Sequence, residues 1–158
     1  MQLNFDNRGG IRRIYAIPVE DILRIRRNWG TKTVTPELRR RDRVIALPAY
    51  AGQSYNFKEE KNHAEQGVRY ACSISGVIPA QLVKPEECVV LSYGEWIVLH
   101  QDARGRIRMS GTKEIPLRYD STSDTGSSSA DLNGESFTFS AVEEHESPEC
   151  YIADILNL

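Results

Sequence analysis

The clearest alternation of apolar and polar side chains lies in one stretch, Val68-Arg69-Tyr70-Ala71-Cys72-Ser73-Ile74-Ser75. Successive side chains of a strand point to opposite faces, so every second residue of this stretch shares a face. The face that begins with Val68 is apolar and the other is mostly polar. The stretch therefore predicts a β-strand with one face in a core and the other in water or shared with another chain.

Two hairpins are expected on either side of this strand. Trp96–His100 is a dense apolar run, Asp102–Gly105 supplies turn residues, and Arg106–Met109 alternates back. Earlier in the chain, Val44–Leu47 and Ser54–Lys58 predict a second hairpin around a turn.

Helical signals are few and short. Lys84-Pro85-Glu86-Glu87 places proline and two carboxylates in a first turn, and Gly94 stands where a short helix would end. Val19–Trp29 spaces its apolar residues loosely at helical intervals, which indicates a short helix, with a strand as the alternative. Ile11–Ile17 predicts a strand that closes at Pro18.

Polar segments separate these elements. Residues 30–41 contain Pro36 and an arginine run, and we interpret them as an exposed basic arm. Glu59–Gln66 is a polar span, and residues 120–134, mostly Ser, Thr, Asp and Gly, predict a long loop. A further strand follows at Phe137–Val142, and another after Pro148.

The pattern as a whole, about eight to ten short strands with one or two short helices, predicts a mainly β fold, an antiparallel β-sandwich or barrel. A length of 158 residues fits a single β domain over residues 1–158. Apolar residues make up 40% and charged residues 27%, as in ordinary globular proteins. The longest apolar run, Trp96–Leu99, is far too short to cross a bilayer, so we expect no membrane partner.

Charge is distributed unevenly along the chain. Residues 1–43 hold eleven Lys and Arg against five Asp and Glu, whereas the remaining residues hold nine against seventeen. A basic segment can bind nucleic acid or the acidic part of an identical subunit. We favour the second, because the segment lacks base-reading and aromatic-stacking motifs.

Catalytic constellations are missing from the sequence. His63, His100 and His145 are far apart, and no nucleophile elbow or phosphate-binding loop is present. His145, among four glutamates, is the best candidate for a cation site, but we favour a solvated acidic edge. Residues 120–126 superficially suggest calcium ligands but lack the glutamate and register of an EF-hand loop.

The cysteines also give no indication of a metal or catalytic site. Cys72, Cys88 and Cys150 are an odd number at wide spacing, so we expect buried free thiols rather than a metal site or disulfide. We therefore predict no enzyme activity, no metal and no cofactor.

Free sheet edges, a basic arm and opposite charges would let such a chain add strands to its neighbours and stack by charge complementarity. These features predict a homo-oligomer, with a monomeric β domain as the alternative. The residues expected to contact neighbouring chains are Arg26, Arg27, Arg39, Arg40, Arg41, Arg43, Asp124 and Asp131.

Four groups of motifs cover most of the chain: Gly9-Gly10-Ile11 with Ile14–Pro18; Gly67–Tyr70 with Ser73–Pro79; Trp96–Leu99 with Asp102, Gly105 and Gly111; and Pro116-Leu117, Thr125-Gly126, Asp131 and Asn133-Gly134 with Phe137–Ser140. In this order they resemble uncharacterised virion proteins carried by prophages of gut bacteria. Those proteins are similar in turn to the tail-tube and tail-completion group of phages.

The resemblance implies a β-sandwich or barrel that assembles into rings, commonly hexameric, with other virion proteins as partners. It further implies a place in the virion after synthesis in the bacterial host cytoplasm. The arm at 30–41 and the loop at 120–134 would then be the inter-subunit elements. No catalytic residue is implied.

Two rival functions stay open. A capsid or neck protein would touch packaged DNA through its basic segment. A ligand-binding or carbohydrate-binding β-sandwich module would be favoured if Trp29, or Tyr50 and Tyr55, lay exposed on one face.

Overall fold

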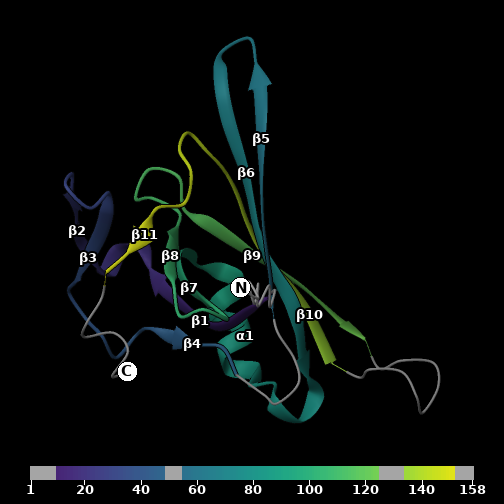
Figure 1. Cartoon of the computed structure of the whole chain (residues 1–158). Coiled ribbons are helices and arrows are strands. Elements are labelled where there is room, and N and C mark those ends of the chain that lie inside the picture. Colours follow the sequence, from purple (N-terminus) through teal and green to yellow (C-terminus); the bar gives the residue numbers. More distant parts are fainter. Residues whose placement is uncertain (1–9, 49–54, 125–133, 152–158) are drawn as a thin grey trace, which may run out of the picture.

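The computed structural model describes residues 10–48, 55–124 and 134–151. It confirms a mainly β fold with one short α-helix among the described residues (Figure 1). In chain order the elements are β1 (Ile11–Pro18), η1 (Val19–Asp21), β2 (Ile22–Asn28), β3 (Thr33–Leu38), β4 (Ile45–Ala46), β5 (Asn56–Ala64), β6 (Gly67–Pro79), η2 (Ala80–Leu82), α1 (Pro85–Tyr93), β7 (Glu95–Asp102), β8 (Ile107–Ser110), β9 (Leu117–Asp124), β10 (Gly134–Glu143) and β11 (Glu149–Cys150).

The strands form one branched sheet. Its main path runs β2-β3-β11-β8-β7-β9-β10-β6-β5, and β1 branches from β7 and also pairs with β4. All pairings are antiparallel except that of β11 with β3. Among the described strands the path does not return from β5 to β2. Ile11 of β1 bridges Tyr55, directly before β5, through two backbone hydrogen bonds of 2.7 and 2.8 Å. Beyond that bridge the outer edge of β5 has no strand partner among the described residues, and neither has the outer edge of β2.

Strands β1 and β7 are buried on both faces and separate two hydrophobic cores. Ile14 and Ala16 of β1 pack in the first core, whereas the alternate residues Tyr15 and Ile17 pack in the second. Strand β7 divides its side chains in the same way. A strand buried on both faces needs apolar residues at every position, which explains the continuous apolar run Trp96–Leu99.

The first core is filled by aromatic rings from the half of the sheet that holds β9, β10 and β6. Phe137 contacts Tyr55, Tyr119 and Phe139 at ring-centroid distances of 5.4, 6.0 and 5.9 Å. Gly76 faces this cluster, and a Cβ atom there would lie 2.3 Å from Tyr55 Cδ1. The glycine in the middle of β6 is therefore required by packing.

Helix α1 confirms the helix expected near residue 84. Pro85 opens it, Glu86 and Glu87 lie in the first turn, and Gly94 follows its last residue. The indole N–H of Trp96 donates to the Leu91 carbonyl at 3.0 Å, which fixes the helix on the first core. No helix in the described parts of the chain is long and apolar enough to cross a membrane.

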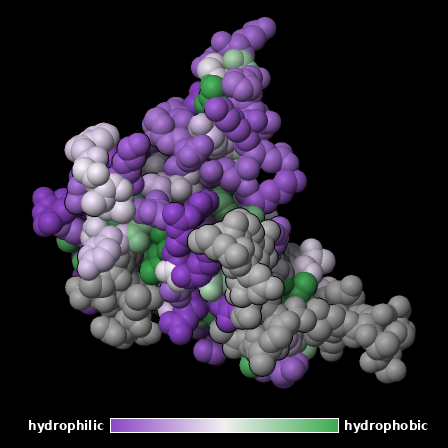
Figure 2. Space-filling model, viewed as in Figure 1, coloured by the Kyte–Doolittle hydropathy of each residue, from purple (hydrophilic) through white to green (hydrophobic). Residues whose placement is uncertain are grey.

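The β5–β6 hairpin projects from the rest of the molecule (Figure 1). Strand β10 accompanies β6 from Pro79 as far as the pair Tyr70–Glu143. Beyond that pair, residues 62–64 and 67–69 form a ribbon of two strands only. Its surface is mainly hydrophilic (Figure 2).

The hairpin expected at Trp96–Met109 is confirmed as β7 and β8. The hairpin expected from Val44–Leu47 and Ser54–Lys58 is wrong: β4 pairs with β1, and β5 pairs with β6. The span Glu59–Gln66 is largely strand, because residues 59–64 belong to β5.

Three other local predictions are corrected or refined. Residues 22–28 form a strand, the alternative to the helix expected at Val19–Trp29. The segment 30–41 is no free arm, since Thr33–Leu38 forms β3 inside the sheet. The loop expected at 120–134 is shorter, because β9 continues to Asp124 and β10 begins at Gly134, while residues 125–133 lie outside the described part.

Candidate functional site

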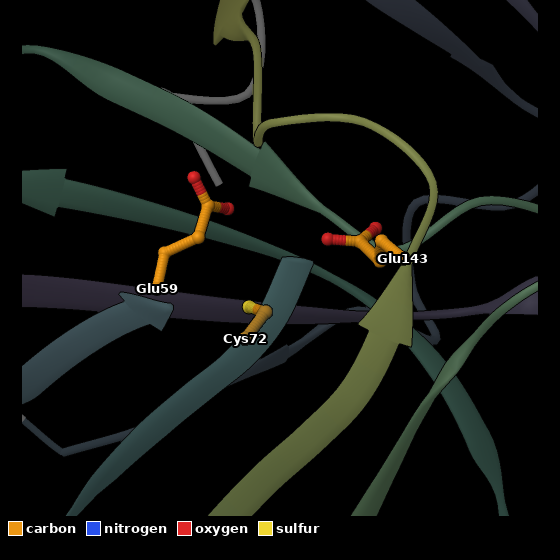
Figure 3. Close-up of side chains that lie close together, drawn as sticks. All are labelled: Glu59, Cys72 and Glu143. Atoms are coloured by element: carbon orange, nitrogen blue, oxygen red, sulfur yellow. The ribbon is translucent and has the colours of Figure 1, made fainter. Parts of the chain in front are cut away.

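Three ionisable side chains meet at the root of the projecting hairpin. Glu59 of β5 is the direct cross-strand partner of Cys72 of β6, and Cys72 is in turn opposite Ala141 of β10, two residues from Glu143. This register puts all three side chains on one face of the sheet. Figure 3 shows the two carboxylates turned toward each other beside the Cys72 sulfur. Their ligand-type atoms all lie within 4.8 Å of one another.

A chain of hydrogen bonds holds Glu59 in place. His100 Nε2 lies 3.0 Å from Ser110 Oγ, which lies 2.9 Å from Ser147 Oγ, and the Ser147 hydroxyl donates to Glu59 Oε2 at 2.8 Å. The Ser147 backbone N–H donates to the same oxygen at 3.0 Å. An ionised carboxylate only accepts, so the chain runs from an Nε2–H of His100 toward Glu59.

Glu143 is buried and incompletely satisfied. It is 5% exposed, and its Oε1 accepts the Gly111 N–H at 2.7 Å. Its Oε2 has no hydrogen-bond partner within the described residues. Burial raises the pKa of Glu143 to about 7; the charge of Glu59 adds to this shift and the Gly111 hydrogen bond opposes it.

Glu135 is an instructive contrast, because this equally buried carboxylate is fully engaged. Tyr119 donates to one oxygen and Cys88 to the other, both at 2.9 Å. Burial by itself would raise the pKa of Glu135, but hydrogen bonds from Cys88, Ser121 and Tyr119 outweigh it and hold the pKa below its ordinary value. Glu135 is thus accounted for by local structure, whereas Glu143 is not.

The three cysteines are free in the structure, as the sequence predicted, with Cys72 and Cys150 buried and Cys88 half-buried. Burial raises the pKa of Cys72 to about 11, and the neighbouring carboxylates Glu143 and Glu59 contribute. Cys72 is therefore a protonated thiol at neutral pH in the metal-free protein.

A groove of about 700 Å³ opens beside the cluster. Glu143 lines it together with Glu114, Glu144, His145 and Glu146, and Arg27 lies at its rim. The acidic group around His145 is therefore gathered at one surface depression. The fourth glutamate of that stretch, Glu149, forms an ion pair with Arg106 instead, at 2.8 Å.

Three of the six arginines predicted to contact neighbours form ion pairs with described residues of their own chain. Arg26 pairs with Glu37, Arg40 with Asp42 at 2.7 Å, and Arg43 with Asp21 and Glu20.

The remaining predicted contact residues are scattered. Arg27 lines the groove, Arg39 donates its backbone N–H to Asp21, and the Arg41 carbonyl accepts from Val44. Asp124 is the last residue of β9, and Asp131 lies outside the described residues. The structure therefore gathers these residues into no single site.

The cluster of Glu59, Cys72 and Glu143 was missed by sequence reasoning. One signal was present: Tyr55, Phe57 and Glu59 alternate on the same face, so Glu59 occupies the position that follows two core-facing aromatics. A carboxylate at such a position predicts a polar partner in the core.

Comparisons with protein-family models, with curated proteins and with solved structures find no match to this chain. Its own geometry defines the class of protein: a mainly antiparallel β protein whose described sheet path ends in β2 and β5, with a largely buried cluster of two carboxylates and a thiol. The described residues place that cluster where the hairpin joins the sheet.

Proposed function

We propose that this chain is a structural subunit that joins identical copies through its end strands, as a component of a phage tail or a related particle. The observation that carries the proposal is the pair of open edges among the described strands, on β5 beyond the Ile11–Tyr55 bridge and on β2 at the other end of the sheet path. An open edge presents unpaired N–H and C=O groups to any strand that approaches.

The β5–β6 hairpin supports this role. A ribbon of two strands has little stability by itself in water, yet this one extends beyond the reach of β10. Residues 60–67 are all exposed, so the end of the ribbon contributes no side chain to either core. A strand from a neighbouring chain, added along β5, would supply the missing third strand.

The two edges differ, so pairing between them is head to tail. Such contacts generate rings when the rotation between neighbours closes and filaments when it does not. Charge contributes less than we expected from the sequence, because Arg26, Arg40 and Arg43 already form ion pairs within the chain. The ring order is left to experiment.

Shortening the hairpin tests the proposal. Replacing Asn62–Arg69 by Asn-Gly leaves Lys61 and Tyr70 as the last pair and keeps Glu59 and Cys72. We expect light scattering after size exclusion to show concentration-dependent oligomers for the wild-type chain and monomers for the shortened chain. The control replaces the tip residues Glu65 and Gln66 by alanine and should still assemble. A wild-type chain that stays monomeric at high concentration would contradict the proposal.

The carbohydrate-binding alternative required an exposed Trp29, or Tyr50 and Tyr55 exposed on one face. Trp29 is 80% exposed, but Tyr55 is 5% exposed and packs against Phe137 in the first core. Tyr50 lies outside the described residues. The exposed Trp29 therefore favours that alternative, whereas the buried Tyr55 does not.

A further inference from the structure

We propose that Glu59, Cys72 and Glu143 form a binding site for one divalent transition-metal ion of the zinc class at the root of the β5–β6 hairpin. The inference is independent of the proposed assembly, because all three side chains belong to one chain. It rests on the convergence of the donor atoms, on the unpaired Glu143 oxygen and on the groove that leads to it.

The donor set selects the kind of ion. Two carboxylates and a thiol match Zn²⁺, which binds oxygen, nitrogen and sulfur ligands, and they match other borderline metals of the first transition row. Mg²⁺ and Ca²⁺ prefer oxygen ligands throughout and would leave the Cys72 sulfur unused. Zn²⁺ is therefore the ion to test first.

The buried Glu143 oxygen is the second, independent observation. Two side-chain oxygens are buried without a hydrogen bond among the described residues, Glu143 Oε2 and Asp21 Oδ2. Asp21 has the guanidinium of Arg43 at 3.2 Å to balance its charge. Glu143 forms no ion pair with a cation in the described structure, and the like-charged Glu59 lies within 4.8 Å of it. A divalent ion between the two carboxylates would remove the repulsion and satisfy the orphaned oxygen.

The surroundings have the features of a supported metal site. Ser147 holds Glu59 through two hydrogen bonds, and the Gly111 N–H holds Glu143. Hydrogen bonds of this kind orient ligands and tune their affinity. Glu114, Glu144 and Glu146 line the groove, so a cation approaching Glu143 meets a negative surface.

Binding must displace protons. The thiolate is the form of cysteine that binds metals, so the Cys72 proton is released to solvent when the ion enters. Glu143 likewise binds the ion as the carboxylate and gives up any proton it holds. No oxidation or other co-reactant is involved.

The first test measures Zn²⁺ binding directly. Wild-type protein freed of metal is dialysed against Zn²⁺ and the bound metal is quantified by mass spectrometry. We expect one tightly bound ion per chain, retained in excess Mg²⁺ and Ca²⁺. Glu143→Gln should weaken binding by at least about tenfold. The matched control is Glu86→Gln, an exposed glutamate in the first turn of α1 and outside the groove, which should bind as the wild type does.

The second test identifies the sulfur ligand. Co²⁺ bound through a thiolate shows a charge-transfer absorption in the near ultraviolet that oxygen ligands alone do not give. The wild-type chain and the Cys150→Ser control should show this band, and Cys72→Ser should lose it. Circular dichroism of each variant establishes that it is folded.

Failure of wild-type protein to bind Zn²⁺ stoichiometrically overturns the proposal without reference to any variant. Binding that survives unchanged in Cys72→Ser, with the absorption band intact, also overturns it and indicates capture by other surface groups. Neither result bears on assembly, because the measurements are made on dilute monomer. Conversely, a variant that no longer assembles but still binds Zn²⁺ would not contradict the metal-site proposal.

Discussion

At the scale of the single residue, His100 shows how burial turns a side chain into a source of pH dependence. Its ring lies on that of Phe57 with centroids 4.3 Å apart, and its Nε2 is bonded to Ser110. Burial, with the charge of Arg108 adding to it, lowers the pKa of His100 to about 3. The folded chain therefore keeps this imidazole neutral at pH values where the unfolded chain protonates it.

The free energy of unfolding should consequently fall as the pH drops from about 6.5, the ordinary pKa of histidine, toward 3. Between pH 7.5 and pH 5 this single group should remove about 2 kcal/mol. Urea denaturation at both pH values gives the free energy of unfolding of the wild type and of His100→Gln. The difference between the two proteins in how this free energy changes with pH, that is in its slope, is the contribution of His100. The control His63→Gln changes an exposed histidine of the hairpin and should keep the wild-type slope. Equal slopes for His100→Gln and wild type would show that His100 is protonated in the fold.

At the scale of the element, the pair β1–β7 supports most of the interior. Ile97 is fully buried in the second core, while its neighbours Trp96 and Val98 belong to the first. Ile97→Ala should lower the free energy of unfolding by about 2–5 kcal/mol, because it leaves a cavity in a strand that cannot move toward either side. Leu23→Ala, on the half-exposed outer face of β2, should cost less than about 1 kcal/mol by the same thermal or urea measurement. Similar costs for the two changes would contradict the two-core arrangement.

Sequence patterns predicted those elements whose signals are local. The β7–β8 hairpin was found because Asp102 and Gly105 make its turn, and Asp102 Oδ1 indeed accepts from the N–H groups of Arg104 and Arg106. Helix α1 was found because proline and glycine mark its two ends.

Strands with distant partners were harder to predict. Pro36 suggested that residues 30–41 were not a strand, because proline cannot donate a ladder hydrogen bond. The partner strand β11, however, pairs only with Thr33 and Val34 of β3 and does not reach Pro36. Among the described residues no strand therefore pairs with β3 at Pro36 on the side away from β2, and a missing N–H is tolerated at such an edge. Strand β5 showed no alternation at its end, since both of its faces are exposed there.

The cluster at the hairpin root could not be predicted for a related reason. Its members come from three strands, and only the registers of β5 with β6 and of β6 with β10 bring them together. Sequence spacing placed Glu143 in a solvated acidic edge, which is wrong for this residue because it is only 5% exposed. The buried thiol predicted at Cys72 is confirmed.

At the scale of the whole molecule, head-to-tail pairing makes a prediction that symmetric pairing does not. The shortened hairpin blocks the β5 end, and Leu23→Pro blocks the β2 end at a point where the register of β2 with β3 is already interrupted. Each variant alone should be monomeric. Mixed in equal amounts, they should form 1:1 dimers and nothing larger, because one free end of each kind remains. Ultracentrifugation of the mixture distinguishes this from like-to-like association, in which one of the variants would dimerise alone.

The double burial of β1 and β7 has a consequence for how the protein comes apart. Alternate residues of β1 and β7 pack into different cores. Neither core can therefore unfold separately without removing strands that the other core needs. A fragment that keeps one hydrophobic core must retain β1 and β7, which contribute side chains to both cores. The chain is therefore expected to melt in a single cooperative step, with no surviving half.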